Sequence, residues 1–98
     1  MNLPLVFHSE VRGEVDEAYA WHERQRAGLG EEFLAEVQTV IDRIHQTPEL
    51  HAVAYRDIRR ALVHRFKYAV YYRLEPDHIE VIAVQHSKGD PRRWKSRA

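Results

Sequence analysis

Residues 58–97 read IRRALVHRFKYAVYYRLEPDHIEVIAVQHSKGDPRRWKSR, and this stretch decides the fold. It holds successive runs rich in Val, Ile, Tyr, Phe and Leu, the residue types that favour a pleated, half-buried strand. The runs are Ile58–Phe66, Ala69–Leu74 and Ile79–His86. The breaks between them are short, and Pro76-Asp77 is typical of a tight turn. We therefore predict a three-stranded antiparallel meander.

The faces of these predicted strands differ in character. Ile79–His86 is apolar on both faces, which is typical of a strand in the middle of a sheet. Ala69–Leu74 alternates, with Val70, Tyr72 and Leu74 on one face and Tyr71 and Arg73 on the other. The alternation in Ile58–Phe66 is irregular and leaves open which of its faces is buried.

The first half of the chain predicts a short strand and a helical hairpin. The segments are a strand at Leu3–His8, a helix from the N-cap residue Ser9 to Ala27, and a helix from Glu31 to Thr47. Serine favours the N-cap position, and both helices carry apolar residues at helical spacing. Pro48 disfavours helical backbone at the residue before it, so the second helix ends there. The short connection makes the two helices antiparallel neighbours.

The predicted fold class is α+β, in the order β-α-α-β-β-β. The helices must share one core with the sheet, because neither can bury its apolar face alone. Residues 48–57 are expected to form a loop, since the pattern of 51–56 is too weak to assign a strand. Ser87–Ala98 is expected to be an extended basic tail, with a possible turn after Pro91. Its Trp94, among basic neighbours, either forms a contact surface for a partner or folds back onto the core while the tail frays.

Composition bounds the class of protein. The 98 residues suit one domain, spanning 1–98. There is no cysteine, and no histidine pair has ligand spacing on a helix face, so we expect neither a metal site nor a cofactor. No apolar run has membrane-spanning length, and the N-terminus lacks the positive charge of a secretory signal. We therefore expect a cytoplasmic protein.

The net charge of zero hides an asymmetry. Residues 1–50 hold ten acids and four arginines, a net charge of −6. Residues 51–98 hold five acids and eleven Lys or Arg residues, a net charge of +6. This asymmetry suggests a partner of defined charge on one face. Alternatively, the two halves neutralise each other on folding.

Four segments together resemble the RelE/ParE superfamily of toxins from bacterial type II toxin–antitoxin modules. These are Arg59–Leu62, Phe66–Arg73, Ile79–His86 and Asp90–Trp94. They are similar, in order and spacing, to the family's arginine strand, its aromatic strand, its last strand and its Pro-Trp ending. Lys67 stands where a proline is usual, and Asp90 directly precedes Pro91.

The resemblance implies two different activities. RelE-like members cleave mRNA in the ribosomal A site, whereas ParE-like members inhibit DNA gyrase without nuclease chemistry. Both are silenced by an antitoxin whose C-terminal segment wraps the toxin. The partners implied are therefore a cognate antitoxin and either gyrase or the ribosome with its mRNA. A third interpretation is a member that has lost toxicity and persists as an antitoxin-binding domain.

The catalytic residues of a nuclease are incomplete in this sequence. RNA cleavage by 2′-OH attack needs a base, an acid and cations that stabilise the phosphorane. The candidates are Arg60, Arg65 and Arg73 as cations and His64 or His86 as the base. His86, at a strand end, could equally be a structural histidine. Because no tyrosine follows Tyr72, and Ser87 stands where a His-Tyr pair would continue, we favour the ParE-like interpretation.

Basic residues are the expected contacts for the target or the antitoxin. The candidates are Arg59, Arg60, Arg65, Arg73, Arg92, Arg93 and Trp94. We expect Arg60, Arg65 and Arg73 to form one exposed cationic wall, with the helices behind it. Arg59 and Arg60 could instead be a solvated edge that discourages strand pairing. The antitoxin is expected to dock an amphipathic helix in a groove between the hairpin and the sheet and to add a strand at a sheet edge.

Overall fold

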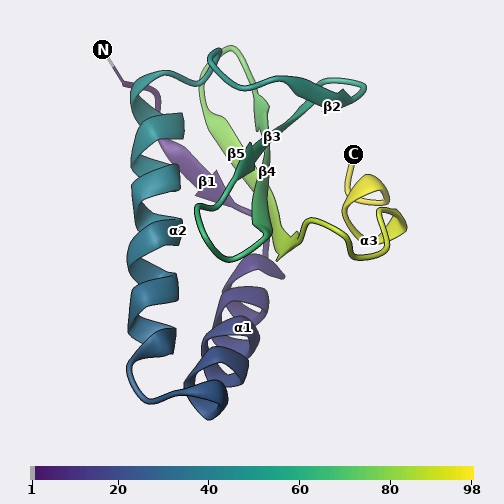
Figure 1. Ribbon diagram of the computed structural model, residues 1–98. Coiled ribbons are helices and arrows are strands. Elements are labelled where there is room, and N and C mark those ends of the chain that lie inside the picture. Colours follow the sequence, from purple (N-terminus) through teal and green to yellow (C-terminus); the bar gives the residue numbers. More distant parts are fainter. Residues whose placement is uncertain (1) are drawn as a thin grey trace.

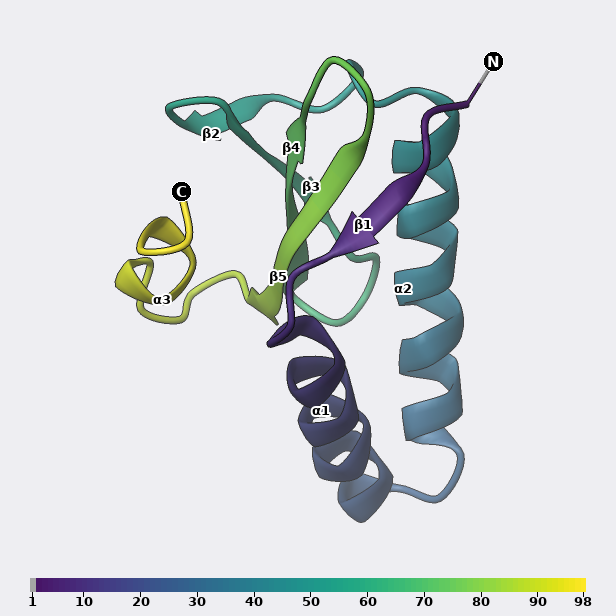
Figure 2. The same cartoon turned by 180° about the vertical axis from the view of Figure 1, so that it is seen from behind.

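The computed structural model describes residues 2–98, which form an α+β fold as predicted. The elements are β1 (Leu5–Phe7), α1 (Val11–Gln25), α2 (Leu29–Gln46), β2 (Val53–Tyr55), β3 (Ile58–Leu62), β4 (Tyr68–Leu74), β5 (Ile79–His86) and α3 (Arg92–Lys95). Figures 1 and 2 show the two long helices beside one twisted sheet, with α3 apart from them.

The sheet has five strands in the order β1-β5-β4-β3-β2. The antiparallel meander of β3, β4 and β5 is confirmed, and so is the central position of β5, between β1 and β4. Two features were not predicted. β1 pairs with β5 in parallel, and β2 adds an antiparallel edge strand to β3. The 51–56 segment was too weakly patterned to reveal β2, because the strand is only three residues long and two of them are exposed.

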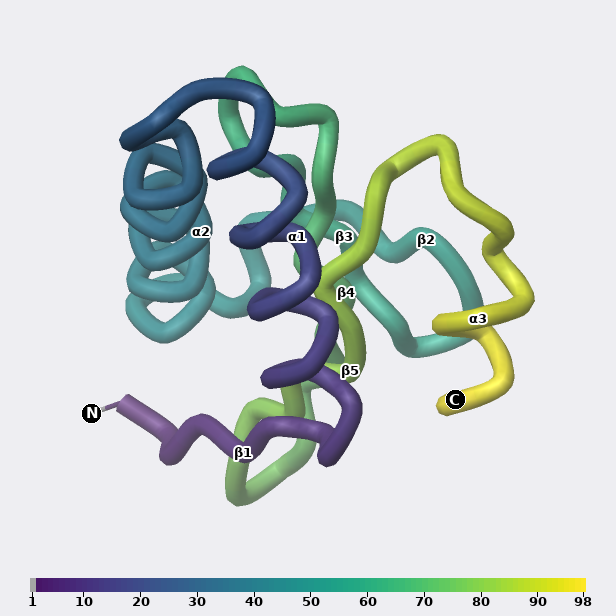
Figure 3. Tube along the Cα trace, turned by 90° about the horizontal axis from the view of Figure 1, so that it is seen from below, coloured from purple at the N-terminus to yellow at the C-terminus, as the bar shows by residue number. Residues whose placement is uncertain are grey.

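Each face of the sheet carries its own core. The helical hairpin packs on one face, where Phe33 and Ile44 of α2 meet Tyr72 of β4, all of them inaccessible to solvent. The opposite face buries Tyr71 of β4 beneath Trp94 of α3. Figure 3 shows the same arrangement from below, with α1 and α2 on one side of the strands and α3 on the other. We call the α3 side the outer face.

Some element bounds differ from the predicted ones. β3 ends at Leu62 and not at Phe66, because Arg65 and Lys67 adopt positive φ angles of 75° and 56° that break the strand into a turn. The first helix begins at Val11, and its N-cap is Glu10 without a side-chain hydrogen bond, so the Ser9 cap was wrong.

The second helix begins at Leu29, earlier than predicted. Gly28 precedes it with a φ of 88°, a left-handed geometry that glycine adopts without steric cost. Glu23, from the last turns of α1, accepts hydrogen bonds from the N–H groups of Gly28 at 3.0 Å and Gly30 at 2.8 Å. These amides have no partner within their own helix, so a side chain of the previous helix caps α2.

This cap predicts an acid-sensitive hairpin. The hydrogen bonds from Gly28 and Gly30 hold the pKa of Glu23 below its usual value of 4.5. Because the folded-state pKa is the lower one, the stabilisation is complete above pH 4.5 and is lost as the pH falls through the folded-state pKa. Glu23→Gln is expected to flatten the fall in stability below pH 4.5, measured by urea unfolding at each pH. Glu36→Gln is the control, because Glu36 forms no hydrogen bond or ion pair within residues 2–98. Equal acid profiles for the wild type and Glu23→Gln would contradict this role.

Candidate functional site

The C-terminal segment is folded onto the outer face, not extended as expected. Trp94 is 6% exposed and stacks on Tyr71 with ring centroids 4.3 Å apart and planes 16° from parallel. Asp90 begins the turn into α3 by accepting hydrogen bonds from the backbone N–H and the guanidinium of Arg92. Of the two alternatives for Trp94, the structure shows the ring folded back, because Tyr71 offers it a flat apolar platform.

A second anchor ties this segment to α1. Arg97 donates to Glu14 Oε2 at 2.8 Å and to the carbonyl oxygen of Ile82 at 3.0 Å. Glu14 also accepts from the N–H of Val84 at 3.0 Å and from Gln85 Nε2 at 2.6 Å. The Arg97 and Glu14 side chains are only 15% and 18% exposed, so one carboxylate joins α1, β5 and the C-terminal segment. We call these two anchors, Trp94 on Tyr71 and Arg97 on Glu14, the C-terminal clamp.

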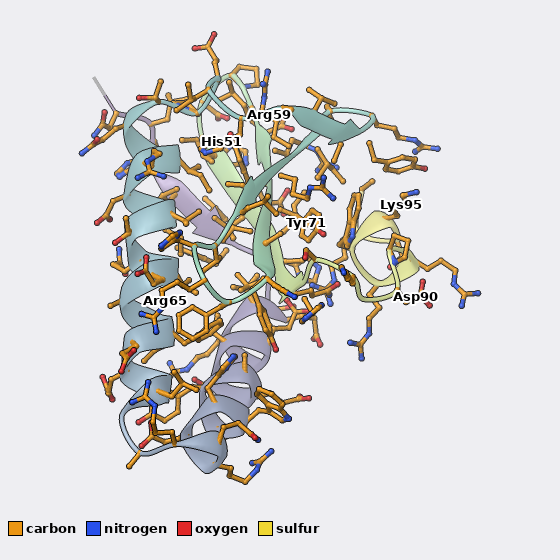
Figure 4. The ribbon with its side chains drawn as sticks, viewed as in Figure 1. His51, Arg59, Arg65, Tyr71, Asp90 and Lys95 are labelled. Carbon is orange, nitrogen blue, oxygen red and sulfur yellow. The ribbon has the colours of Figure 1, made fainter. Side chains whose placement is uncertain are left out.

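The expected wall of Arg60, Arg65 and Arg73 is wrong. Arg73 is 17% exposed and forms ion pairs with Asp57, Glu75 and Glu80 at 3.1, 3.6 and 3.2 Å. Arg65 turns toward α2, where it lies 3.0 Å from Glu32 (Figure 4). That carboxylate also contacts Arg26, and the two guanidinium groups lower the pKa of Glu32. The strand pattern placed these arginines correctly along the chain but could not show which carboxylates neutralise them.

The two neighbouring arginines of β3 have different surroundings. Arg59 faces the α2–β2 connection, where its guanidinium donates to the carbonyl oxygens of Glu49 and His51 at 3.3 and 2.7 Å. Arg60 points to the outer face, opposite Tyr71 in the strand register, and is exposed. Within residues 2–98, Arg60 has no carboxylate partner. Arg60 is therefore available to a binding partner, whereas Arg59 holds a loop in place.

His86 lies at the end of β5 in a small cleft. Its register partner is Tyr68, the first residue of β4, and their rings are 5.4 Å apart. Trp21 of α1 lines the same cleft. Burial, with a smaller effect of Glu17, raises the pKa of Tyr68, so this phenol stays protonated. Tyr68 was not among the predicted site residues, because a tyrosine was expected after His86 in the chain, whereas the hairpin supplies one from the neighbouring strand.

The five nuclease candidates do not converge. Arg73 pairs with Glu80, which lies six residues before His86 on β5, about 20 Å away at the rise of a strand. Arg65 faces α2 and Arg60 the outer face, whereas His86 lies with Tyr68 on the helix side. His64 is exposed in the β3–β4 turn. No three His, Asp or Glu side chains within residues 2–98 converge in a metal-binding arrangement.

An apolar groove runs between β1 and the helical hairpin. It has a volume of about 560 Å³ and is lined by Phe7, Val11, Val15, Leu34, Val37 and Ile41 among others. β1 is an edge strand, and its Val6 and Phe7 are 46% and 48% exposed. The groove and the free strand edge therefore lie together on one side of the molecule.

Comparison with known proteins identifies the family. The model of the family described as "ParE toxin of type II toxin-antitoxin system, parDE" matches residues 5–91. The chain belongs to the ParE toxin family. This assignment rests on the matched residues and not on the arrangement of the arginines, and the match ends before α3.

A solved structure described as a chromosomal ParDE TA system from P. aeruginosa is similar to this ParE-family chain. The TM-score is 0.76 with 10% sequence identity, covering 86% of this chain and 95% of that one. At this identity the similarity concerns the fold alone. A comparison with curated proteins gives no match. None of the helices within residues 2–98 has the length and apolar character needed to cross a bilayer.

Proposed function

We propose that this chain is the toxin of a type II toxin–antitoxin module that inhibits DNA gyrase in the cytoplasm and is neutralised by a cognate antitoxin. The ParE family match over residues 5–91 carries the proposal. The scattering of Arg60, Arg65, Arg73 and His86 supports inhibition by binding over RNA cleavage, because their side chains face different surroundings.

The C-terminal clamp positions a basic binding surface on α3, and this surface needs no catalytic residues. Arg92 and Arg93 are exposed on α3, which is too short to be stable alone. Trp94 and Arg97 fix α3 on the sheet. Trp94 therefore positions the cations that contact the target, and does not itself form part of the contact surface.

The test is a supercoiling assay with purified gyrase and relaxed plasmid. The purified chain is expected to block supercoiling and to leave ribosome-bound mRNA intact. Addition of the antitoxin, the small acidic DNA-binding protein expected from the neighbouring reading frame, should restore supercoiling. Undiminished supercoiling at saturating protein would refute gyrase as the target.

For the antitoxin we propose the groove beside β1. An amphipathic helix would bury its apolar face against α1 and α2, and an extended segment would pair with the free edge of β1. Phe7→Glu places a charge in this groove and is expected to weaken neutralisation at least tenfold while gyrase inhibition persists. Val53→Glu is the matched control, because Val53 is 52% exposed on β2, the other edge strand. Equal neutralisation of both variants in a titration with antitoxin would place the antitoxin elsewhere.

One observation favours a second candidate, a ribosome-dependent endoribonuclease. Tyr68 and His86 form a pair across β4 and β5, and Arg24 and Arg93 line the cleft beside them. In this candidate His86 is the base and Tyr68 the acid, since the raised pKa keeps its proton in place. Primer extension on translated mRNA would show cuts at codon boundaries that His86→Ala abolishes. If expression is harmless and neither assay responds, the chain is a non-toxic antitoxin-binding relic.

A further inference from the structure

Folding preserves the charge asymmetry of the sequence. Only two ion pairs within residues 2–98 join the acidic first half to the basic second half, Arg65 with Glu32 and Arg97 with Glu14. The five carboxylates of the second half pair within that half: Asp57, Glu75 and Glu80 share the single Arg73, Asp77 pairs with His78, and Asp90 pairs with Arg92. The fold therefore does not neutralise the acidic first half with the basic second half.

Three cations of the second half that have no carboxylate partner within residues 2–98 lie near one another on the outer face. Arg56 lies 5.1 Å and Lys95 lies 4.7 Å from the centroid of the same ring, Tyr55, so the two charges are no more than about 10 Å apart. Arg60 joins them from β3, opposite Tyr71. Within residues 2–98 none of the three has a carboxylate partner. We call Arg56, Arg60 and Lys95 the outer basic surface; Figure 4 shows Lys95 and Tyr71 on this side of the sheet.

Exposed charges about 10 Å apart are largely screened at physiological salt, where the screening length is about 8 Å, so the fold can hold these cations together without counter-charges. Clustered on one face without counter-charges of their own, they create a positive potential that attracts a partner of negative charge. We propose that the outer basic surface binds the phosphate backbone of double-stranded DNA without reading its sequence. This inference goes beyond gyrase inhibition and does not depend on it.

The burial of the aromatic rings favours double-stranded over single-stranded DNA as the partner. Proteins that bind single strands use exposed rings on which bases stack. Here Tyr71 and Trp94 are 2% and 6% exposed and stack on each other, and Tyr55 meets Trp94 edge-on beneath Arg56 and Lys95. Because these rings pack against one another, no base can stack on them, and the surface presents only positive charge. Such a surface fits phosphates presented at regular intervals along a duplex, which need no base contact.

An acidic protein fits this surface less well. Stable protein interfaces depend on aromatic or aliphatic anchors that enter pockets. The large aromatic side chains at the outer basic surface are already packed within the fold. Contacts here are therefore mainly ionic, and a polyanion of high charge density provides the most of them.

The test is fluorescence anisotropy with a short labelled DNA duplex of random sequence and no gyrase. Binding is expected to weaken with salt, with a log–log slope near −3, because each neutralised phosphate contributes about −0.9. Changing Arg56, Arg60 and Lys95 together to glutamine should weaken binding at least tenfold and bring the slope close to zero. Arg60→Gln alone, at an exposed position that leaves the fold intact, should reduce the slope by about one.

Matched controls are Lys67→Gln and Arg43→Gln, which remove exposed cations of the β3–β4 turn and of α2 that have no carboxylate partner within residues 2–98. They should bind the duplex as the wild type does. The inference is overturned if the duplex does not bind, if Arg60→Gln and the controls behave alike, or if a single strand or polyglutamate binds as tightly. Because gyrase is absent, each of these results leaves the proposed inhibition of gyrase standing.

Discussion

Glu14→Ala is expected to lower the free energy of unfolding by about 3 kcal/mol, because it removes the acceptor shared by three donors. Arg97 would lose its counter-charge in a site where both side chains are more than four-fifths buried. The N–H of Val84 and the amide of Gln85 would lose their partner as well. Urea unfolding of the purified chain, followed by circular dichroism, measures the change.

The matched control is another carboxylate of α1. Asp16 lies 3.8 Å from Arg12, but these side chains are 71% and 92% exposed, so Asp16→Ala should change stability by less than about 0.5 kcal/mol. Arg97→Gln should cost less than Glu14→Ala, since Glu14 keeps Val84 and Gln85. A Glu14→Ala protein as stable as Asp16→Ala would show that the ion pair contributes no net stability.

The sequence predicted the elements whose signal is local. Alternation and turn chemistry were sufficient for β4 and β5, and helical spacing was sufficient for the hairpin. The apolar pattern of β5 on both faces also predicted its central place. These features depend on residues close together in the chain, and such residues produce a recognisable periodicity in the sequence.

The features that were missed depend on residues far apart in the chain. The cap of α2 comes from Glu23, and the partner of His86 comes from Tyr68 across a hairpin. Glu14 meets Arg97 across 83 positions, and no periodicity links them. The wrong prediction that Arg65 and Arg73 belong to one cationic wall has the same origin, because each forms an ion pair with a carboxylate that the fold brings beside it. Tyr68 could have been predicted from one signal, the register of the β4–β5 hairpin, which pairs it with His86.

Trp94→Ala is expected to release the C-terminal segment from the sheet. Truncating a buried tryptophan costs about 3–5 kcal/mol, and α3 has only four residues, too few to stay helical without its anchor. If Arg97 alone cannot keep α3 on the sheet, α3 detaches while the rest of the fold stays intact. Hydrogen exchange of residues 90–98 and tryptic cleavage after Arg92, Arg93 and Lys95 should then be much faster than in the wild type.

Trp21→Ala separates this effect from the loss of any tryptophan, because Trp21 is 50% exposed and its truncation should cost less than about 1 kcal/mol. Trp94→Phe keeps a ring on Tyr71 and should retain most of the protection. If the clamp positions the cations that contact gyrase, inhibition should fall in parallel with the protection of α3 across these variants. Full inhibition by a Trp94→Ala protein whose segment is cleaved freely would show that a positioned α3 is not needed for activity.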